Sequence, residues 1–305
     1  MLSYSARRIA QAVLVVFAVT TFAFVILRAV GDPARLLVSP EGTMEDLQSL
    51  RRVLGLDVPL WQQYVRFIGH SFVGDFGSSF IHGTDAFKLV ISRLPATLLL
   101  SGAALLIGVP FGMLMGVVAA VNRKKALDQI ATFLAVIGRA TPHFWLAIML
   151  IMVFSVQLRL LPPSGYGSFA HLIMPAVSLG AGLAATIARL TRSCMLDVLS
   201  QDYVRTARAK GLGQDRVVLG HALRNALIPV VTVVGLQLGY LLGGAIITET
   251  VFAWPGIGRL LISAINNYDY PIVQSAIIVI ASAFVLINVA VDLVYALIDP
   301  RVRYD

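Results

Sequence analysis

Few residues in this sequence are capable of acid–base, nucleophilic or metal chemistry, and they are scattered along it. The motifs H-E-x-x-H and G-x-S-x-G do not occur, and neither does the phosphate-binding loop G-x-x-x-x-G-K-[ST], because no Gly-Lys dipeptide exists in the chain. A single cysteine, Cys194, excludes an intrachain disulfide. The histidines lack the spacing of a ligand cluster: His70, His82, His143, His171 and His221. The sequence therefore predicts no catalytic site, no metal site, and no ATP or other cofactor bound by this chain.

The composition indicates that lipid surrounds most of the chain. Of its 305 residues 58% are hydrophobic and 13% are charged, whereas soluble domains are nearer half apolar and a quarter charged. One domain of this length cannot bury such an excess in a core, but a membrane can. Six stretches approach or exceed the ~20 residues that a helix needs to cross ~30 Å of hydrocarbon. We expect an all-α integral membrane protein in one domain, 1–305, with spans near 9–30, 96–121, 132–158, 172–190, 227–248 and 272–298.

The distribution of positive charge predicts the orientation of these spans. The formal net charge is +8, which in a soluble protein would suggest nucleic acid, but basic loops on the cytoplasmic side explain it here. The short loops 159–171 and 249–271 carry one arginine each, and the outer loop, residues 32–95, is too long for its charges to count. Both termini are thus predicted to be cytoplasmic, together with Arg7, Arg8, Arg123, Lys124, Lys125, Arg189, Arg192, Arg205, Arg208, Lys210, Arg216, Arg224, Arg301 and Arg303.

Several features inside the spans bear on packing and on a pathway. Two stripes of glycine, each with a four-residue spacing, predict close helix packing unless they arise by chance: Gly108, Gly112 and Gly116, then Gly235, Gly239 and Gly243. Ionisable groups within a membrane often mark a substrate path, although buried structural pairing explains them equally well. The path candidates are Arg139, His143 and Asp292, and we expect Arg139 and Asp292 in the cytoplasmic half.

The segment between the fourth and fifth spans, residues 191–226, is the most informative part of the sequence. Good helix formers from Asp202 end at Lys210 and Gly211, a helix C-terminal signal, and a second helix is expected before Pro229 opens the fifth span. Gly211 is expected to adopt a positive φ in the turn between them. Such a pair of helices makes a compact projection suited to docking, and an ordinary basic loop is the alternative reading.

This segment resembles the EAA motif of ATP-binding-cassette (ABC) importer permeases, which reads Glu-Ala-Ala, three residues, Gly. The matching positions are Arg205-Thr206-Ala207 and Gly211, where Arg and Thr replace the first two residues as in the R-T-A-x-A-K-G form of the peptide branch. His221-x-Leu223-Arg224-Asn225 continues the likeness. Further matches follow the branch in order along the chain: Gly31-Asp32-Pro33, Leu54-Gly55-Leu56-Asp57-x-Pro59-Leu60, Gly74-Asp75-Phe76-Gly77-x-Ser79, Arg93-Leu94-Pro95-x-Thr97-Leu98, Glu249-x-Val251-Phe252-x-Trp254-Pro255-Gly256-x-Gly258 and Asp269-Tyr270-Pro271.

The chain as a whole is similar to the dipeptide/oligopeptide permease family (DppB/OppB/GsiC type). That resemblance implies a type I ABC importer permease in a bacterial inner membrane, half of a pore made with a second homologous permease. Two cytosolic ATP-binding subunits would use ATP and Mg²⁺, and an extracytoplasmic binding protein would deliver substrate. The residues implied in ATPase coupling are Arg205, Thr206, Ala207, Ala209, Lys210, Gly211, His221, Arg224 and Asn225.

The substrate implied by the family is a dipeptide, an oligopeptide or glutathione. Import of a nickel chelate by the same family is the main alternative, and an ion-coupled secondary carrier is a more remote one, disfavoured by the lack of a series of spaced acids. A membrane enzyme is disfavoured because no cluster of His, Asp or Glu is visible. Aromatic residues predict that the outer loop folds into short amphipathic helices, which either meet the binding protein, cover the pore mouth or only pack: Trp61, Tyr64, Phe67, Phe72, Phe76 and Phe80.

Overall fold

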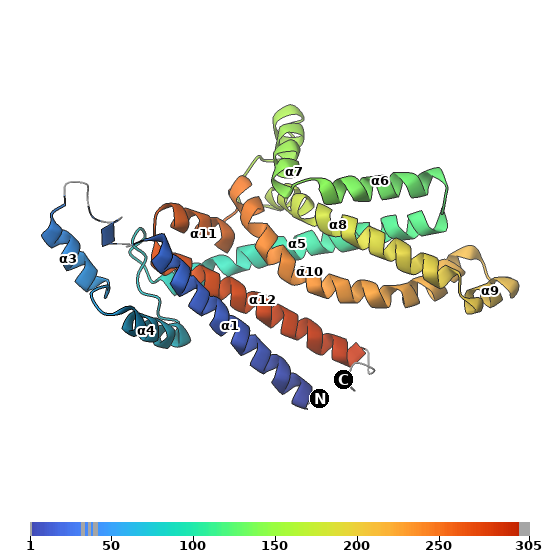
Figure 1. The fold of residues 1–305 in the computed structure, drawn as a ribbon. Helices are drawn as coiled ribbons and strands as arrows, with labels where there is room; N and C mark the ends of the chain where they lie inside the picture. Colours follow the sequence, from blue (N-terminus) through green and yellow to red (C-terminus); the bar gives the residue numbers. More distant parts are fainter. Residues whose placement is uncertain (1, 32–33, 36–37, 39–41, 299–305) are drawn as a thin grey trace. The chain divides into compact units, whose positions relative to one another are not determined.

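The computed structural model describes residues 2–31, 34–35, 38 and 42–298, without the side chains of 2–6, 30 and 292–298. Every regular element in this part of the chain is a helix (Figure 1). The bounds are α1 Leu2–Val30, α3 Met44–Val53, α4 Leu60–Val73, α5 Ala86–Val121, α6 Ala126–Ala140, α7 His143–Leu150, η1 Ile151–Gln157, α8 Phe169–Leu199, α9 Asp202–Ala209, η2 Arg216–Ala222, α10 Leu223–Val251, α11 Ile257–Asn266 and α12 Tyr270–Ile298.

The chain forms two compact units, which are described separately. Unit 1 comprises Met1–Ala96, Pro255–Ala296 and Pro300–Asp305, and unit 2 comprises Thr97–Trp254 and Leu297–Asp299. Helices α5 and α12 each cross from one unit to the other along the chain.

The six predicted spans are present, with corrections to their form. Five lie in single helices that are long and apolar enough to cross a membrane, namely α1, α5, α8, η2 with α10, and α12. Several of these helices are longer than their apolar stretches, because hydropathy detects only the part that suits lipid. The sequence predicted that Pro229 opens the fifth span, but Pro229 lies inside α10. Membrane helices tolerate proline where neighbouring groups satisfy the freed backbone.

The third predicted span, 132–158, is not one straight helix. Its two halves, α6 and α7 with η1, meet at an angle of 105°. Thr141 and Pro142 are extended, with ψ of 123° and 137°. For Thr141 the cause is the ring of Pro142, because a proline disfavours helical geometry in the residue before it. The hydroxyl of Thr141 donates to the carbonyl of Ile137 at 2.8 Å and closes the end of α6.

Helix α8 is the centre of unit 2, where α6, α7 and α10 pack against it. The glycine stripe on α5 packs against it too, and this confirms the prediction of close packing for the second span. A Cβ atom at Gly112 would lie 2.5 Å from the carbonyl oxygen of Ala184, and Gly108 and Gly116 meet α8 in the same way. On α10, Gly235 and Gly239 are buried, but in the described part of the chain no atom outside the adjoining backbone of α10 lies within 4 Å of a Cβ placed at Gly243.

Unit 1 confirms that the outer loop contains folded helices. The capped helix α3 is followed by α4, which packs on α1. The hydroxyls of Thr21 and Tyr64 lie 2.8 Å apart, and the ring of Phe24 contacts those of Tyr64 and Phe67. Trp61 and Phe72 remain largely exposed, which suits helices at a membrane interface or beneath a partner.

In unit 1, hydrogen bonds also connect the outer loop to the turn between α11 and α12. The hydroxyl of Ser79 donates to the carboxylate of Asp269 at 2.5 Å, and the backbone N–H of Phe80 donates to it at 3.2 Å. Both Ser79 and Asp269 are buried. Two short sequence motifs separated by most of the chain therefore form one structural joint.

Candidate functional site

The candidate coupling site is built on α9. Asp202 in the first turn and Arg208 in the last complement the helix dipole, and alanines favour the helix between them. The helix stops at Lys210, and Gly211 follows with φ of +78°, which confirms the predicted turn. Because a side chain at such a φ is strained, glycine is the residue suited to this position.

One face of α9 is used for packing inside the chain. Val204 and Ala207, three residues apart, are buried and form a core cluster with Val217 of η2. The place of Ala207 in the motif suggested contact with a partner. Its side chain is instead buried within this chain. The exposed positions of the motif are Arg205, Thr206, Ala209, Lys210 and Gly211.

The second helix of the segment differs from the expectation, because it is continuous with the fifth span. The π-helical turn η2 runs directly into α10. Val218 and Ala222 of η2 pack on Met195 of α8, so the base of the projection belongs to the core of unit 2. His221, Arg224 and Asn225 are exposed beside α9. The side-chain amide of Asn225 donates a hydrogen bond of 2.7 Å to the hydroxyl of Tyr203.

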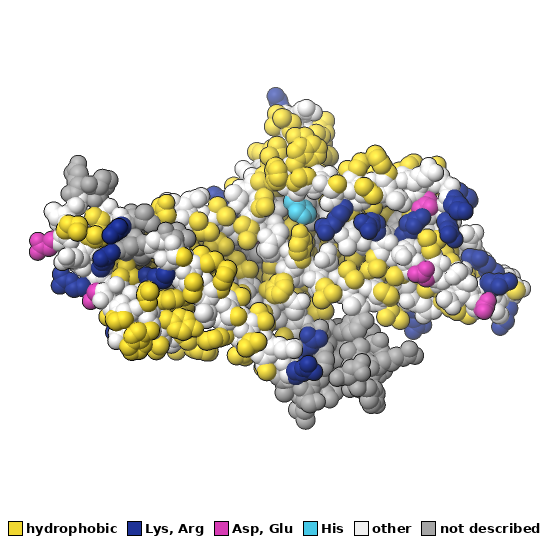
Figure 2. All heavy atoms as spheres, viewed as in Figure 1, with side chains coloured by type: hydrophobic (Ala, Val, Ile, Leu, Met, Phe, Trp, Pro, Cys, Tyr) yellow, Lys and Arg dark blue, Asp and Glu magenta, His cyan; other side chains and the backbone are white. Residues whose placement is uncertain are grey.

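The surface of this projection is strongly basic. Lys and Arg side chains gather over the end of unit 2 that carries α9 (Figure 2). The ion pair between Arg205 and Asp202, at 3.5 Å, is highly exposed, so it contributes little to stability. The guanidinium of Arg205 thus remains available to a partner with acidic groups.

Of the three candidates for the substrate path, His143 makes contacts within the chain that hold two helices together. Its Nδ1 lies 3.3 Å from the carbonyl oxygen of Ser178, and the hydroxyl of Ser178 donates to the carbonyl of His143 at 3.0 Å. Its ring fills the space over Gly182. These contacts hold the start of α7 on α8 at the bend. Arg139 is exposed on α6, and the side chain of Asp292 lies outside the described residues.

Sequence reasoning missed two polar pairs in unit 2. Arg192 donates through Nε and Nη2 to the two carboxylate oxygens of buried Asp128, at 2.6 and 2.9 Å. The hydroxyl of Thr97 donates to the carboxylate of Glu249 at 2.6 Å, and Glu249 is fully buried. Glu249 was noted only as part of a motif. Its partner lies 152 positions away, which no local pattern reveals.

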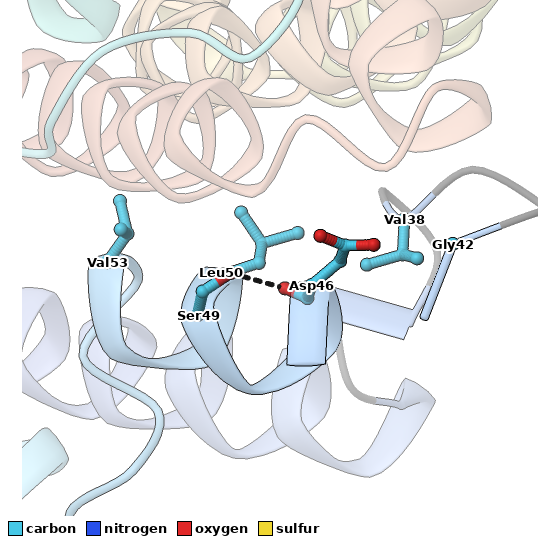
Figure 3. Close-up of a pocket in the computed structure, with 6 residues that line it drawn as sticks. All are labelled: Val38, Gly42, Asp46, Ser49, Leu50 and Val53. Atoms are coloured by element: carbon cyan, nitrogen blue, oxygen red, sulfur yellow. Dashed lines mark hydrogen bonds between the residues drawn. The ribbon is translucent and has the colours of Figure 1, made fainter. Parts of the chain in front are cut away.

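A hollow of about 340 Å³ beside α3 is not a candidate site. Its lining includes Asp46 and Ser49, whose hydroxyl donates to the carbonyl oxygen of Asp46 at 2.8 Å (Figure 3). The carboxylate of Asp46 accepts from the N–H and the hydroxyl of Thr43, and these bonds lower the pKa of Asp46. Its charge is used to cap α3. Among the described residues, no group of three His, Cys, Asp or Glu side chains could hold a metal ion.

Comparison with known families and proteins finds matches over the whole chain. Residues 108–304 match the family described as binding-protein-dependent transport system inner membrane component, and residues 1–101 match the N-terminal region of such components. The glutathione transport system permease protein GsiC of Escherichia coli K12 is 44% identical over 305 residues, covering 100% of each chain. The protein of that name from Salmonella paratyphi A is 45% identical over 306 residues, with the same coverage.

Two solved structures share the fold. An inward-facing MetNI methionine ABC transporter chain has a TM-score of 0.61 at 21% identity, covering 70% of this chain and 97% of that one. A chain of an amino acid ABC transporter with histidines has a TM-score of 0.54 at 19% identity, covering 70% and 94%. At these identities the likeness establishes a type I ABC permease fold and nothing about substrate.

Proposed function

Because the chain belongs to the family of binding-protein-dependent transport system inner membrane components, we propose that it forms half of the translocation path of an importer for short peptides, glutathione included. The observation that carries the substrate class is the match at 44–45% identity over the full length of glutathione permeases. The chain is a transport subunit, and its family acts with an ATPase and a substrate-binding protein.

The partners that we propose are a second homologous permease, two cytosolic ATP-binding subunits and one extracytoplasmic binding protein. ATP and Mg²⁺ belong to the ATP-binding subunits, since the sequence has no phosphate-binding loop. Both termini are proposed to be cytoplasmic, as the positions of the basic residues favour. In that orientation α9 projects toward the ATPase, and the outer loop, whose described part includes α3 and α4, faces the binding protein.

The contacts that hold α9 against η2 and α10 support the coupling role that we propose for it. Val204 and Ala207 attach it to η2, which is continuous with α10, and the bond between Tyr203 and Asn225 adds a polar link to the same helix. A movement of α9 is thereby passed to a membrane span without a flexible joint. The exposed residues Arg205, Thr206, Ala209, Lys210 and Gly211 are left to contact the ATPase, with His221 and Arg224 beside them.

We assign different roles to the three residues that were candidates for the substrate path. His143 shapes the bend between α6 and α7 instead of meeting substrate, because both its ring and its carbonyl contact Ser178. Arg139 lies among exposed apolar side chains of α6, which favours contact with lipid over contact with a peptide. Asp292 keeps its proposed place on the path from its sequence position alone.

Uptake by the reconstituted importer tests the proposal. The chain is co-purified with its partner subunits, placed in proteoliposomes, and supplied with the binding protein and ATP. We expect ATP-dependent accumulation of glutathione or of a dipeptide. Accumulation of a nickel chelate alone, or uptake by this chain without ATP and partners, would contradict it.

A further inference from the structure

Helix α6 is held to α8 in two different ways along its length (Figure 1). In its second half, Ala135 packs with Ala185 and Ala188 of α8. A Cβ placed at Gly138 would lie 3.3 Å from the Cβ of Ala185, so the contact there is also small and apolar. Contacts of this kind have no preferred direction, and a hollow of about 290 Å³ lies beside them between α5, α6 and α8. They therefore leave the position of α6 on α8 loosely fixed.

The start of α6 is held by a buried ion pair with α8. Arg192 donates through Nε and Nη2 to the two carboxylate oxygens of Asp128, at 2.6 and 2.9 Å, and this two-pronged geometry fixes direction as well as distance. The same carboxylate accepts from the N–H of Lys124 at 2.9 Å, in the turn between α5 and α6. Within the described residues, no other hydrogen bond or ion pair joins α6 to α8. The pair thus sets where α6 lies on α8.

The pair lies next to the base of the coupling segment. Met195 follows Arg192 by three residues, which is about one helical turn. Met195 is fully buried and packs with Val218 and Ala222 of η2. Because Val217 of η2 packs on α9 in turn, a continuous series of contacts leads from α9 through η2 and the end of α8 to the ion pair.

We propose that Asp128 and Arg192 are positioning residues of the coupling path, which pass a movement of α9 on to α6. The inference rests on the coupling role proposed for α9 and extends that role by one helix. Helix α6 ends at the 105° break beside Thr141 and Pro142, so it follows α8 without turning α7 by the same amount. A pair that served only the fold would change stability and leave uptake per ATP unaltered.

A variant that keeps the fold and removes the ion pair separates these roles. Asp128→Leu/Arg192→Met replaces the pair by apolar side chains, a change that is often neutral for stability, whereas a single substitution leaves one charge buried and unpaired. We expect the assembled importer to keep its ATPase and its thermal midpoint, while uptake per ATP hydrolysed falls about tenfold. The control Asp197→Leu/Arg189→Met makes the same changes at exposed positions of α8 and behaves as the unaltered chain.

A second variant and a second readout make the test independent of the first. Asp128→Asn/Arg192→Gln keeps a neutral, hydrogen-bonding pair and is expected to show the same loss of uptake per ATP. The distance between α6 and η2 is measured with spin labels in place of exposed Ile130 and Leu219, in a Cys194→Ser background. We expect one distance in the unaltered chain, both without nucleotide and with nucleotide trapped by vanadate, and loss of that single distance in the pair variants.

Three outcomes would overturn the proposal. One is normal uptake per ATP in both pair variants, and another is an equal loss in the control. The third is a distance between α6 and η2 that differs between the nucleotide states of the unaltered chain. If Gly211→Val uncouples uptake from hydrolysis while the pair variants behave normally, this inference fails alone. If Gly211→Val also leaves coupling intact, the role of α9 fails with it.

Discussion

The side-chain amide of Asn225 donates a 2.7 Å hydrogen bond to the hydroxyl of Tyr203, and the bond joins α9 to the first turn of α10. Both residues belong to the segment for which we propose the contact with the ATPase, yet only Asn225 was singled out from the sequence. Tyr203 is 42% exposed, so its hydroxyl could bond to water instead. The direct bond to α10 instead gives the proposed coupling role a link between the two helices that a variant can remove.

Tyr203→Phe removes the acceptor and keeps the ring. We expect ATP hydrolysis by the assembled importer to persist while uptake per ATP falls by up to about tenfold, the worth of one net hydrogen bond. Adding Asn225→Ala to this variant costs nothing further, because the bond is already lost. Tyr268→Phe, in an exposed turn of unit 1, serves as the control. Additive losses in the double variant would show that the bond carries no coupling.

The joint between Ser79 and Asp269 predicts how firmly the outer loop is held. Ser79→Ala removes a donor to a buried carboxylate and also the acceptor that Ser79 Oγ offers to the N–H of His82 at 2.9 Å. Leaving such groups unsatisfied costs about 1–3 kcal/mol. We expect added protease to cut the loop near residues 76–85 at least about fivefold faster. Ser92→Ala, whose hydroxyl bonds only locally to Leu89, is the control, and equal cutting rates in both variants would count against the joint.

The contact of α5 with α8 predicts different outcomes for two glycines of one helix. A Cβ at Gly112 would lie 2.5 Å from the carbonyl oxygen of Ala184, whereas no described residue beyond the adjoining turns of α5 comes within 4 Å of a Cβ at Gly102. Gly112→Ala should therefore destabilise the purified chain by about 1–3 kcal/mol through overpacking. Gly102→Ala should leave it unchanged or stabilise it by about 0.5–1 kcal/mol through helix propensity. Thermal unfolding in detergent measures both, and equal midpoints would contradict the packing.

Sequence reasoning succeeded where the signal was local. The apolar stretches revealed the spans, the four-residue spacing of Gly108, Gly112 and Gly116 predicted their contact, and the C-terminal signal at Gly211 predicted its turn. Each of these depends only on residues within a few helical turns. Arg139, Pro142 and His143 interrupt the third apolar stretch in the sequence, but the 105° angle depends on how α7 packs on α8.

Local sequence patterns could not predict which polar residues pair across long distances in the sequence. Nothing near Asp269 indicates Ser79, and nothing near Asp128 indicates Arg192, because the fold alone brings these residues together. The inward direction of Ala207 was a different error. Its spacing of three from Val204 marks a buried helical face, but its place in the motif drew attention to contact with a partner.

Coupling between ATP hydrolysis and uptake in the assembled importer tests the central claim most directly, with one pair of variants. Gly211 has φ of +78° and Gly213 has no positive φ, while a Cβ at either position meets open space. Gly211→Val therefore strains the backbone by about 1–2 kcal/mol, and Gly213→Val lacks that strain.

The measurement is co-purification of the ATPase together with uptake per ATP hydrolysed in proteoliposomes. We expect Gly211→Val to insert normally but to release the ATPase or to lower uptake per ATP about tenfold. Gly213→Val should behave as the unaltered chain. If Gly211→Val keeps the ATPase, the stimulated hydrolysis and the uptake of the unaltered chain, then α9 is not the coupling element and the account fails.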